Sequence, residues 1–448
     1  MSANLTMSEL ISALSCALDM TEGQPPGHCM RCCWIGVQLG QQMDLPDEQL
    51  WELYYCLLLK DLGCSSNAAR ICQLYATDDL AFKRDFKRVN GSLQQVLNFV
   101  ITKTGVQQGV AERFKSIVSV LGNGEELATE LIQTRCERGA VIARQLRFSE
   151  AVAAGIHSLD EHWNGGGKPE NLSGEQVPLY SRIALLAQVV DVFHSEAGSE
   201  AALAEVRQRS GSWFDPSLVE LFEQLAAKPA FWQGLGAPNL ADRLLTLEPA
   251  TQVIELDEAF IDEIAAAFGQ VVDSKSPYTA GHSERVALYT DLLAEKLGFS
   301  ESRRRWLRRA ALLHDVGKLG VSNSVLDKPG KLDDDEWQAV KQHAAFTEQI
   351  LSRIKAFDEL AQVAGAHHER LDGLGYPKGL KGEEISLETR VITTADIFDA
   401  ITAERPYRGP IPVPKALEMM AESVHSQLDQ TCLEALQQVA DDLRLNGY

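Results

Sequence analysis

The sequence lacks any run of about 18 apolar residues, although 45% of its residues are hydrophobic. A helix needs a run of that length to cross a membrane, so we expect a globular chain with no membrane partner. The alternation of apolar and polar residues that is typical of half-buried strands is also scarce. Apolar residues instead recur at helical spacing, as in Leu288, Leu292, Leu293 and Leu297, which predicts an all-α fold.

Positive charge is in short supply. The chain has 42 Lys and Arg residues against 63 Asp and Glu residues, which gives a net charge of −21. Nucleic acid polymers and anionic lipids are usually bound through a broad basic face, so we expect neither as a partner. The basic stretch 303–309 (RRRWLRR) is therefore interpreted as a solvated helix face. Any anionic substrate must be held by local cations.

A basic segment is also missing from the first 20 residues, MSANLTMSELISALSCALDM, which carry Glu9 beside their apolar positions. This pattern predicts an amphipathic helix rather than a secretion signal, and hence a cytoplasmic protein. The nine cysteines are then expected to be free thiols. Cys29, Cys32 and Cys33 resemble half of a zinc site, but no second CxxC pair follows, so we do not expect zinc there.

The length of 448 residues exceeds what one compact core usually holds, which favours two domains. Residues 235–252 (LGAPNLADRLLTLEPATQ) contain the best candidate boundary, because Pro and Gly interrupt the helical pattern. We predict domains at residues 1–235 and 255–448, joined by a linker over 236–254.

A faint internal repeat relates the two predicted domains. Residues 27–31 (GHCMR) precede residues 281–285 (GHSER) by 254 positions, whereas residues 162–169 (HWNGGGKP) precede residues 370–377 (RLDGLGYP) by 208. The shorter offset means that the first half carries about 46 extra residues between its matched blocks. We interpret the halves as diverged copies of one helical domain. Opposite the basic stretch, the first half has Trp51 and Tyr55, an apolar face expected to pack against the other half or a partner.

The second half gathers the side chains that bind metals. Five of the ten histidines fall there together with two aspartates: His282, His314, Asp315, His343, His367, His368 and Asp396. Any one of these histidines alone would more often be an ordinary core or surface residue. Their joint presence favours a site for two metal ions bridged by Asp315, with positions left open for water and substrate.

The first half has lost most of these donors. At the matching positions it has Lys60 for His314, Leu159 and Asp160 for His367 and His368, and Gln188 for Asp396. A lysine ammonium binds a metal only when deprotonated, and leucine has no donor atom. We predict that this copy binds no metal and catalyses nothing.

These blocks resemble the HD-GYP domain, a subgroup of the HD phosphohydrolases, over roughly residues 255–435. The likeness is carried by His314-Asp315, by Gly375-Tyr376-Pro377 and by the surrounding blocks in the same order. The resemblance implies two tandem HD-domain helical bundles, the second with a GYP loop. It also implies hydrolysis of a cyclic dinucleotide, chiefly cyclic di-GMP, while some tandem proteins with a degenerate first copy prefer 3′,3′-cyclic GMP-AMP. The product would be a linear dinucleotide, with further cleavage to mononucleotides left open.

The resemblance also assigns roles to residues. His282, His314, Asp315 and Asp396 would hold one metal, and Asp315, His343, His367 and His368 the other, with iron or manganese favoured over nickel or magnesium. Asp315 and Lys318 would be catalytic, and substrate would be bound by Lys318, Tyr376, Arg405 and Arg408. Members with a third metal carry a Glu where this chain has Tyr278, which favours two metals and leaves Asp399 to support a ligand.

A second class of function stays open at this point. The protein could bind a cyclic dinucleotide and report it to a signalling partner through the GYP loop or the first domain, with little hydrolysis. A homodimer is also compatible with the sequence. An HD hydrolase that acts on nucleoside triphosphates or guanosine tetraphosphate is disfavoured by the Gly-Tyr-Pro loop.

Overall fold

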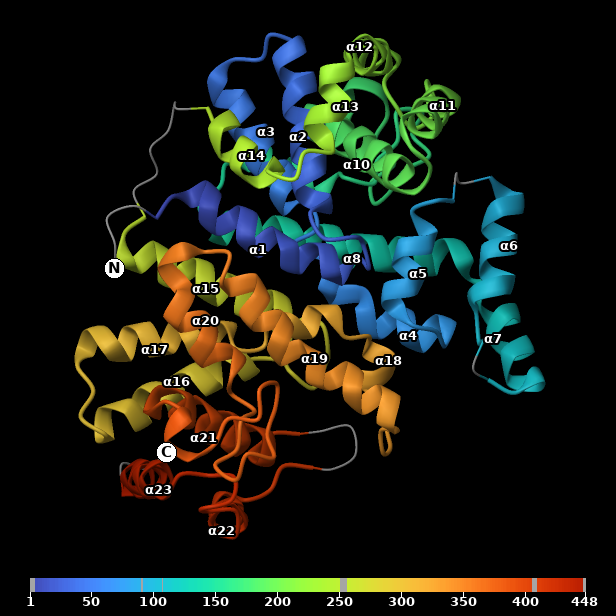
Figure 1. The fold of residues 1–448 in the computed structure, drawn as a ribbon. Helices are drawn as coiled ribbons and strands as arrows, with labels where there is room; N and C mark the ends of the chain where they lie inside the picture. Colours follow the sequence, from blue (N-terminus) through green and yellow to red (C-terminus); the bar gives the residue numbers. More distant parts are fainter. Residues whose placement is uncertain (1–4, 90–91, 107, 250–255, 405–408, 446–448) are drawn as a thin grey trace. The chain divides into compact units, whose positions relative to one another are not determined.

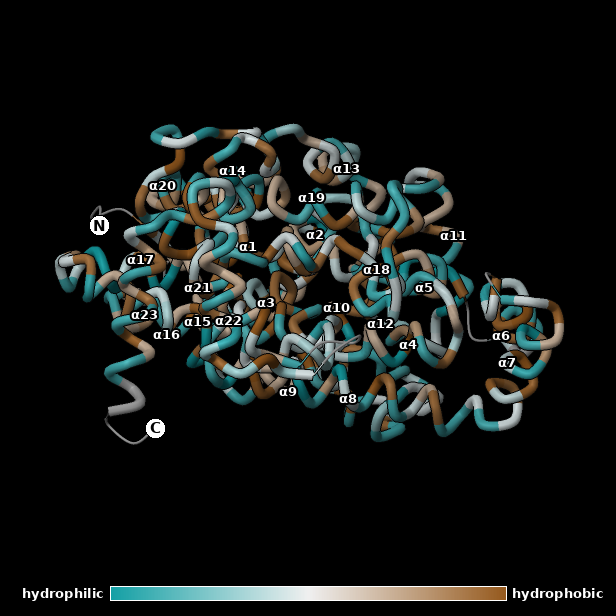
Figure 2. Tube along the Cα trace, turned by 90° about the horizontal axis from the view of Figure 1, so that it is seen from below, coloured by the Kyte–Doolittle hydropathy of each residue, from teal (hydrophilic) through white to brown (hydrophobic). Residues whose placement is uncertain are grey.

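The computed structural model describes residues 5–89, 92–106, 108–249, 256–404 and 409–445. The fold of these residues is helical, with three isolated bridges and no longer strand among them, which confirms the all-α prediction. None of the helices in this part of the chain combines the length and the apolar character that a membrane span requires. The chain divides into an N-terminal unit, residues 6–256, and a C-terminal unit that begins at Asp257. Figure 2 shows hydrophobic and hydrophilic residues interspersed along the helices of both units.

The C-terminal unit is a bundle built around α16, which packs against α17 and α21 (Figure 1). Its helices are α15 (Glu258–Asp273), α16 (His282–Lys296), α17 (Glu301–Leu313), α18 (Asn323–Leu326), α19 (Asp334–Leu351), α20 (Asp358–Gly365), α21 (Leu387–Thr402), α22 (Val413–Ala421) and α23 (Gln430–Leu445). Three 3₁₀ helices join them, η3 (Val316–Gly320), η4 (Lys355–Phe357) and η5 (Gly382–Glu384). Asp333 and Glu336 form a capping box at the start of α19.

The N-terminal unit is larger and has its own core. Its helices are α1 (Met7–Thr21), α2 (His28–Gln42), α3 (Asp47–Leu59), α4 (Ala68–Tyr75), α5 (Asp79–Phe86), α6 (Leu93–Lys103), α7 (Val110–Gly122), α8 (Gly124–Gln145), α9 (Glu150–His157), α10 (Leu179–Ala197), α11 (Ser199–Arg209), α12 (Pro216–Ala226), α13 (Pro229–Leu235) and α14 (Leu240–Leu247). The 3₁₀ helices η1 (Cys64–Asn67) and η2 (Gly174–Gln176) complete it. Thr6 caps α1, the amphipathic helix expected from the first residues.

The segment predicted as a linker is structured over much of its length. Residues 240–247 form α14, which packs against α2 with Leu240 and Leu244 buried. Just beyond this helix, Glu248 accepts a hydrogen bond of 2.5 Å from the Tyr55 hydroxyl. The expectation of a linker over 236–254 is thus wrong for α14, because regularly spaced leucines give this helix an apolar face that the N-terminal unit buries.

The Trp51 and Tyr55 face is not free for a partner. Both side chains are buried within the N-terminal unit, where their rings contact each other and Phe148. The basic stretch 303–309 is also accounted for within its own unit. Arg303, Arg304, Arg305 and Arg309 all form ion pairs with nearby Asp or Glu side chains. Their charges are balanced locally, but the expected solvated helix face is wrong for Arg309, whose side chain is fully buried against Glu258 and Asp262 of α15.

Matching residues of the two units make matching bonds. Asp273 accepts hydrogen bonds from the backbone N–H and the hydroxyl of Ser283 at the start of α16, and Asp19 accepts them from Gly27 and Cys29 at the start of α2. A Cβ added to Gly375 would meet the backbone of residues 368–370, and one added to Gly167 would meet the backbone of residues 160–162. The first pair of matching contacts is separated by the offset of 254 residues and the second pair by the offset of 208. The internal likeness therefore extends from residue types to their bonds.

Candidate metal centre

His282 begins α16 and is held by a carboxylate on α21. Its Nδ1 lies 2.7 Å from Oδ2 of Asp399, and Arg285 donates to the same carboxylate from Nε at 2.6 Å. An ionised carboxylate only accepts, so Nδ1 donates its hydrogen to Asp399, and Nε2 is the nitrogen left to face Asp315 and Asp396. Gly281 precedes the helix with a φ of 68°, a conformation that favours glycine. The ring is thereby oriented with Nε2 facing the centre of the bundle.

Three further histidines are oriented by backbone carbonyl groups. Nδ1 of His314 lies 2.6 Å from the carbonyl of Ala311, and Nδ1 of His367 lies 2.6 Å from that of Ala364. His343 makes the same bond one turn back on α19. A carbonyl can only accept, so all three rings keep the hydrogen on Nδ1 and a free lone pair on Nε2. This is the tautomer in which a histidine binds a metal through Nε2.

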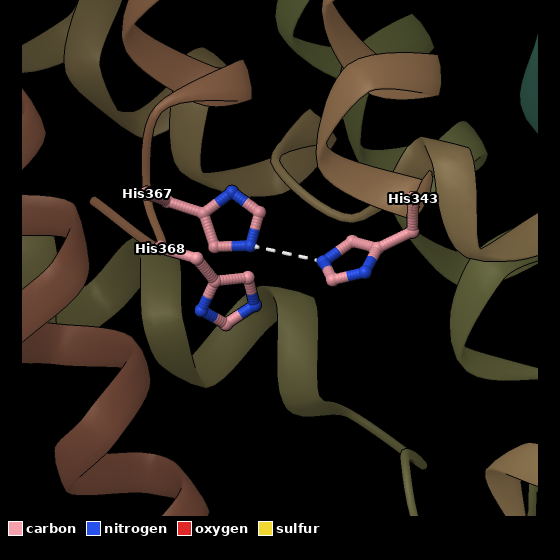
Figure 3. Close-up of side chains that lie close together, drawn as sticks. All are labelled: His343, His367 and His368. Atoms are coloured by element: carbon pink, nitrogen blue, oxygen red, sulfur yellow. Dashed lines mark hydrogen bonds between the residues drawn. The ribbon is translucent and has the colours of Figure 1, made fainter. Parts of the chain in front are cut away.

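The lone pairs of His343 and His367 face each other. Their Nε2 atoms are 3.4 Å apart, as the dashed line in Figure 3 marks, and neither atom has a hydrogen to donate. Two lone pairs at this distance repel unless a cation lies against them. His368 lies beside them, its ring centroid 4.0 Å from that of His367 and 5.0 Å from that of His343. Nitrogen atoms of the three rings lie within 4.8 Å of one another.

Asp315 lies between two groups of histidines and turns one oxygen to each. Oδ2 is 3.4 Å from Nε2 of His282 and 3.2 Å from Nε2 of His314. Oδ1 is 3.5 Å from Nε2 of His343 and 3.6 Å from Nε2 of His367. A carboxylate that serves two sets of imidazoles through different oxygens has the geometry of a bridging ligand. Oδ1 has no hydrogen-bond partner among the described residues.

Asp396 on α21 completes the first group. One of its oxygens lies 3.4 Å from Nε2 of His282 and 3.8 Å from Nε2 of His314. Nε2 of both histidines is buried and has no hydrogen-bond partner in the described part of the chain. Buried polar atoms without partners are costly, and a divalent cation would satisfy all of them. The donor set therefore fits metal ions, with imidazole and carboxylate ligands suited to iron, manganese and zinc.

The charges around the centre favour a cation as well. Burial alone would lower the pKa of His282, but Asp315 and Asp399 raise it to about 9, so positive charge is stabilised at this point. Burial would raise the pKa of Asp315, but His314 and Lys318 hold it well below its usual value. Burial lowers the pKa of His343 to about 3, which leaves this ring neutral at pH 7.

The remaining predicted site residues lie in different surroundings. Lys318 is half-buried in η3 with Nζ 2.5 Å from Oδ2 of Asp315. The ring of Tyr376 lies against His368, 4.8 Å between centroids, so this tyrosine walls the second histidine group. Arg405 and Arg408 lie outside the described residues. Tyr278 lines the cavity next to the centre.

A cavity of about 700 Å³ opens beside Asp315 and Lys318. Three further lysines that we did not predict to bind substrate also line it, Lys275, Lys328 and Lys331. The sequence offered a signal only for Lys328, which stands in the Lys-Pro-Gly block. The cavity is large enough for a nucleotide ligand, and its lysines suit phosphate groups.

Glu369 is a second residue that sequence reasoning passed over. It is buried, and its carboxylate accepts hydrogen bonds from the backbone N–H groups of Lys378, Gly379 and Leu380. Glu369 directly follows His368 in the sequence. Its hydrogen bonds therefore hold the loop that contains Tyr376 close to His368. In the N-terminal unit, the carboxylate of Glu161 accepts from residues 170 and 172 in the same way.

Comparison with known proteins adds to this geometry. A model of the HD domain family matches residues 106–218 and 267–432. The chain belongs to the HD domain family. HD domains are metal-dependent phosphohydrolases, in line with the candidate ligand groups found here. Within the family, the Gly375-Tyr376-Pro377 loop places the chain in the HD-GYP group.

Relatives of this HD-GYP protein act on cyclic dinucleotides by name. The 3′3′-cGAMP-specific phosphodiesterase 3 of Vibrio cholerae is 61% identical over 430 residues, which cover 96% of this chain and 94% of that protein. The 3′3′-cGAMP-specific phosphodiesterase 1 of the same organism is 36% identical over 51% of this chain and 53% of its own length. The cyclic di-GMP phosphodiesterase response regulator RpfG of Xanthomonas campestris is 37% identical over 45% of this chain and 52% of its own length. A crystal structure of a V. cholerae cyclic GMP-AMP-specific phosphodiesterase, V-cGAP3, matches with a TM-score of 0.68, 54% identity and 98% coverage of both chains.

Proposed function

We propose that this protein is a metal-dependent phosphodiesterase that opens a cyclic dinucleotide to a linear one, with 3′,3′-cyclic GMP-AMP as the preferred substrate and cyclic di-GMP as the second candidate. The observation that carries the proposal is the position of Asp315, which turns one oxygen to each histidine group beside a cavity of about 700 Å³. The relative that is 61% identical along nearly the whole chain favours the hybrid dinucleotide.

Two divalent cations, iron or manganese before nickel or magnesium, are proposed to bind in this centre. His282, His314, Asp315 and Asp396 would hold one, and Asp315, His343, His367 and His368 the other. When bound, such ions supply Lewis acidity to the phosphodiester and to the attacking water. Tyr278 lines the cavity without a carboxylate, which supports two ions rather than three.

The chain's own residues bind and orient the substrate. The ammonium of Lys318 lies at the cavity beside Asp315, where it can donate to a phosphate oxygen and stabilise the negative charge that develops there. Lys328 and Lys331 add cations along the cavity wall. Tyr376, Arg405 and Arg408 are proposed as further substrate contacts on the strength of the sequence resemblance. Four lysines line the cavity against three aspartates, whereas acidic residues outnumber basic ones in the whole chain.

The N-terminal unit is proposed to be non-catalytic. Lys60 occupies the position of His314, and its Nζ lies 3.1 Å from Nε2 of His28 and 3.1 Å from Oε1 of Gln188. It also contacts the carboxylate of Asp61. His28, Gln188 and Asp61 correspond to His282, Asp396 and Asp315. The ammonium of Lys60 therefore lies among the residues that correspond to the proposed ligands of the first metal.

We further propose that the protein is cytoplasmic. All nine cysteines lie in the described part of the chain as free thiols, which supports a reducing cytoplasm. A signalling partner at the GYP loop or the N-terminal unit, and a homodimer, are further predictions. A reporter with little hydrolysis is the alternative function, which turnover measurements distinguish.

The proposal is tested by incubating the purified chain, reconstituted with Mn(II) or with Fe(II) under anaerobic conditions, with each cyclic dinucleotide. Products are separated by liquid chromatography. We expect faster conversion of 3′,3′-cyclic GMP-AMP to a linear dinucleotide, and loss of turnover in the His314→Ala, Asp315→Ala double variant. Failure to convert either substrate with either metal would contradict the enzyme proposal. Turnover that survives in the double variant would contradict the assigned centre.

A further inference from the structure

The N-terminal unit contains a cavity of its own at the place that matches the metal centre. Its volume is about 260 Å³, and Gln188 and Asp160, which correspond to Asp396 and His368, line it. Part of its wall comes from helices α4 and α5, which lie in the stretch where the C-terminal unit has only η3 and α18. The inserted helices thus build a new cavity over an altered centre.

In this unit a basic residue stands where each histidine group of the C-terminal centre has a ligand. Lys60 stands in place of His314, as described above. Gly63 lies close to the backbone of α8 at Arg135 and Gly139. Gly317 lies close to the backbone of α19 at His343 and Thr347 in the same way. Arg135 therefore corresponds to His343 of the second histidine group. The guanidinium of Arg135 pairs with Asp160. Two ligands of the C-terminal centre, His314 and His343, are thus replaced by basic residues in the N-terminal unit.

The cavity carries an excess of positive charge in an acidic chain. Four basic residues line it, Lys83, Lys87, Arg135 and Lys168, against two carboxylates, Glu22 and Asp160. Lys87 and Lys83 pair with Glu22, at 2.9 Å and 3.7 Å. Nζ of Lys168 is 3.5 Å from a carboxylate of Glu125, whose side chain is 89% exposed, and such a contact contributes little. The cavity can therefore accept a small anion.

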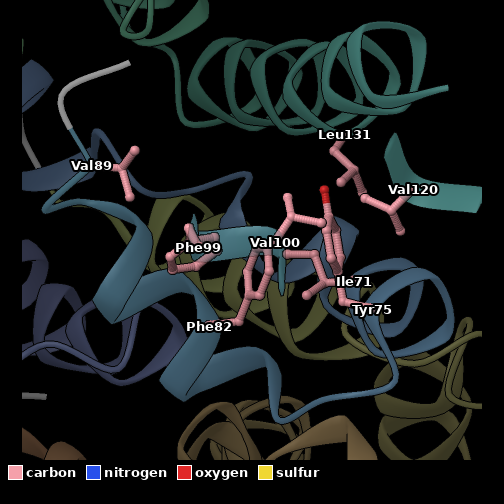
Figure 4. Close-up of a cluster of buried hydrophobic side chains, with 8 residues drawn as sticks. All are labelled: Ile71, Tyr75, Phe82, Val89, Phe99, Val100, Val120 and Leu131. Carbon is pink, nitrogen blue, oxygen red and sulfur yellow. The ribbon is translucent and has the colours of Figure 1, made fainter. Parts of the chain in front are cut away.

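The rest of the wall is apolar and aromatic. Figure 4 shows the buried cluster behind it, from which Ile71, Tyr75, Phe82, Val89 and Leu131 reach the cavity. One aromatic ring offers a flat surface to a ligand. Phe86 lines the cavity and 45% of it is exposed, whereas His162 and the guanidinium of Arg209 already lie against the ring of Trp213, each 4.1 Å from its centroid. Aromatic faces of this kind are where nucleobases stack.

We propose that the N-terminal unit binds a nucleoside monophosphate in this cavity, with the phosphate at Lys168 and Arg135 and the base against Phe86, and does not hydrolyse it. The volume decides between ligand sizes, because about 260 Å³ is well below the 700 Å³ of the C-terminal cavity. A cavity of this volume, just below the usual range for ligand pockets, excludes a dinucleotide and leaves room for one nucleotide at most. The proposal is independent of whether the C-terminal unit hydrolyses cyclic dinucleotides.

The test is equilibrium binding of 5′-GMP and 5′-AMP to the full chain treated with EDTA, measured by calorimetry, with inorganic phosphate and guanosine as comparison ligands. We expect binding of a monophosphate that is at least about tenfold tighter than binding of phosphate or guanosine alone, because only the nucleotide uses both the cations and the aromatic faces. Absence of binding, or equal binding of phosphate, would overturn the proposal.

Amino-acid substitutions test whether the nucleotide binds in the N-terminal cavity. Lys168→Met and Phe86→Ala change partly exposed residues, so the unit is expected to stay folded, which a thermal melt checks. Each is expected to weaken nucleotide binding by about tenfold. Lys115→Met removes an exposed lysine of the same unit, and Lys318→Met changes the C-terminal cavity; neither is expected to alter binding. If Lys318→Met alone weakens it, the nucleotide binds in the C-terminal unit and the proposal is wrong.

Discussion

Asp399 accepts a hydrogen bond from Nδ1 of His282 at 2.7 Å and thereby fixes which nitrogen of the ring faces the other candidate ligands. The N-terminal unit repeats this bond between His28 and Asp191 at 2.6 Å, and Arg31 donates to Asp191 as Arg285 donates to Asp399. The same arrangement of histidine, aspartate and arginine is thus present in both units. Among the described residues, this bond orients a histidine toward other imidazole donors only in the C-terminal unit.

This relationship predicts the effect of Asp399→Asn. An amide can donate to Nδ1 and so favour the wrong tautomer, which weakens metal binding or turnover by about 10- to 100-fold. The readouts are bound metal per chain, by mass spectrometry, and the rate of hydrolysis. Asp191→Asn makes the same change in the N-terminal unit and is the matched control. An equal loss of activity in both variants would show that the effect is not local to the metal centre.

Asp315→Asn tests the bridging carboxylate. The amide keeps one acceptor oxygen and loses the negative charge, so the two histidine groups no longer share an anionic ligand. We expect turnover to fall on the order of 1,000-fold, with less than the wild-type content of metal. Asp291→Asn is the control, since Asp291 forms a surface pair with Arg304 in the same unit. Full metal content with full activity in Asp315→Asn would refute the bridging role.

Gly375→Ala tests the close approach in the GYP loop. An added Cβ would lie 2.4 Å from the backbone nitrogen of Arg370 and 2.6 Å from the carbonyl oxygen of His368, so the backbone must shift. We expect a loss of about 1 to 3 kcal/mol in stability together with reduced metal binding, because His368 moves with the loop. Gly122→Ala is the control, as its Cβ would meet open space. The checks are melting temperature and metal content; unchanged values for both would contradict the argument.

Lys87→Met tests the buried charges of the N-terminal unit. Burial alone would raise the pKa of Glu22, but Lys87 and Lys83 lower it from 4.5 to about 2. Its contribution to stability is therefore complete above pH 4.5 and is lost as the pH falls through about 2. Removing Lys87 leaves the buried carboxylate of Glu22 with Lys83, at 3.7 Å, as its remaining ion-pair partner, so at pH 7 we expect a loss of about 3 kcal/mol.

The pH dependence makes this prediction specific. In the variant Glu22 protonates at a higher pH, so the difference in melting temperature between variant and wild type shrinks from pH 7 to pH 3. Lys103→Met, which removes a partly exposed partner of Asp85, is expected to cost less than about 1 kcal/mol. A difference that stays constant across this pH range would show that Lys87 acts through packing.

Much of the candidate centre could be predicted because its ligands stand in short blocks whose spacing carries the signal. His314 and Asp315 follow an apolar helix, and His367 and His368 are adjacent, so their grouping needs little knowledge of the fold. Arg135 could not be matched to His343 in this way, because the inserted residues hide which offset applies to α8. The lysines at 275 and 331 belong to separate segments that meet only in the folded chain.

The prediction for Trp51 and Tyr55 was wrong for a related reason. An apolar helix face shows that something covers it, and periodicity does not say what. Phe148 and Glu248 provide contacts from distant parts of the same unit. The helix Leu240–Leu247 escaped notice because Pro and Gly nearby indicated a linker, although its leucines bury an apolar face.

The ammonium of Lys60 has a consequence for how the two halves respond to their surroundings. A charge that is part of the chain, unlike a bound metal ion, cannot be removed by a chelator. Metal starvation would silence the C-terminal centre while the N-terminal unit keeps its shape. Without metal the C-terminal unit would then be inactive while the N-terminal unit stays folded, and turnover would resume when metal is bound again.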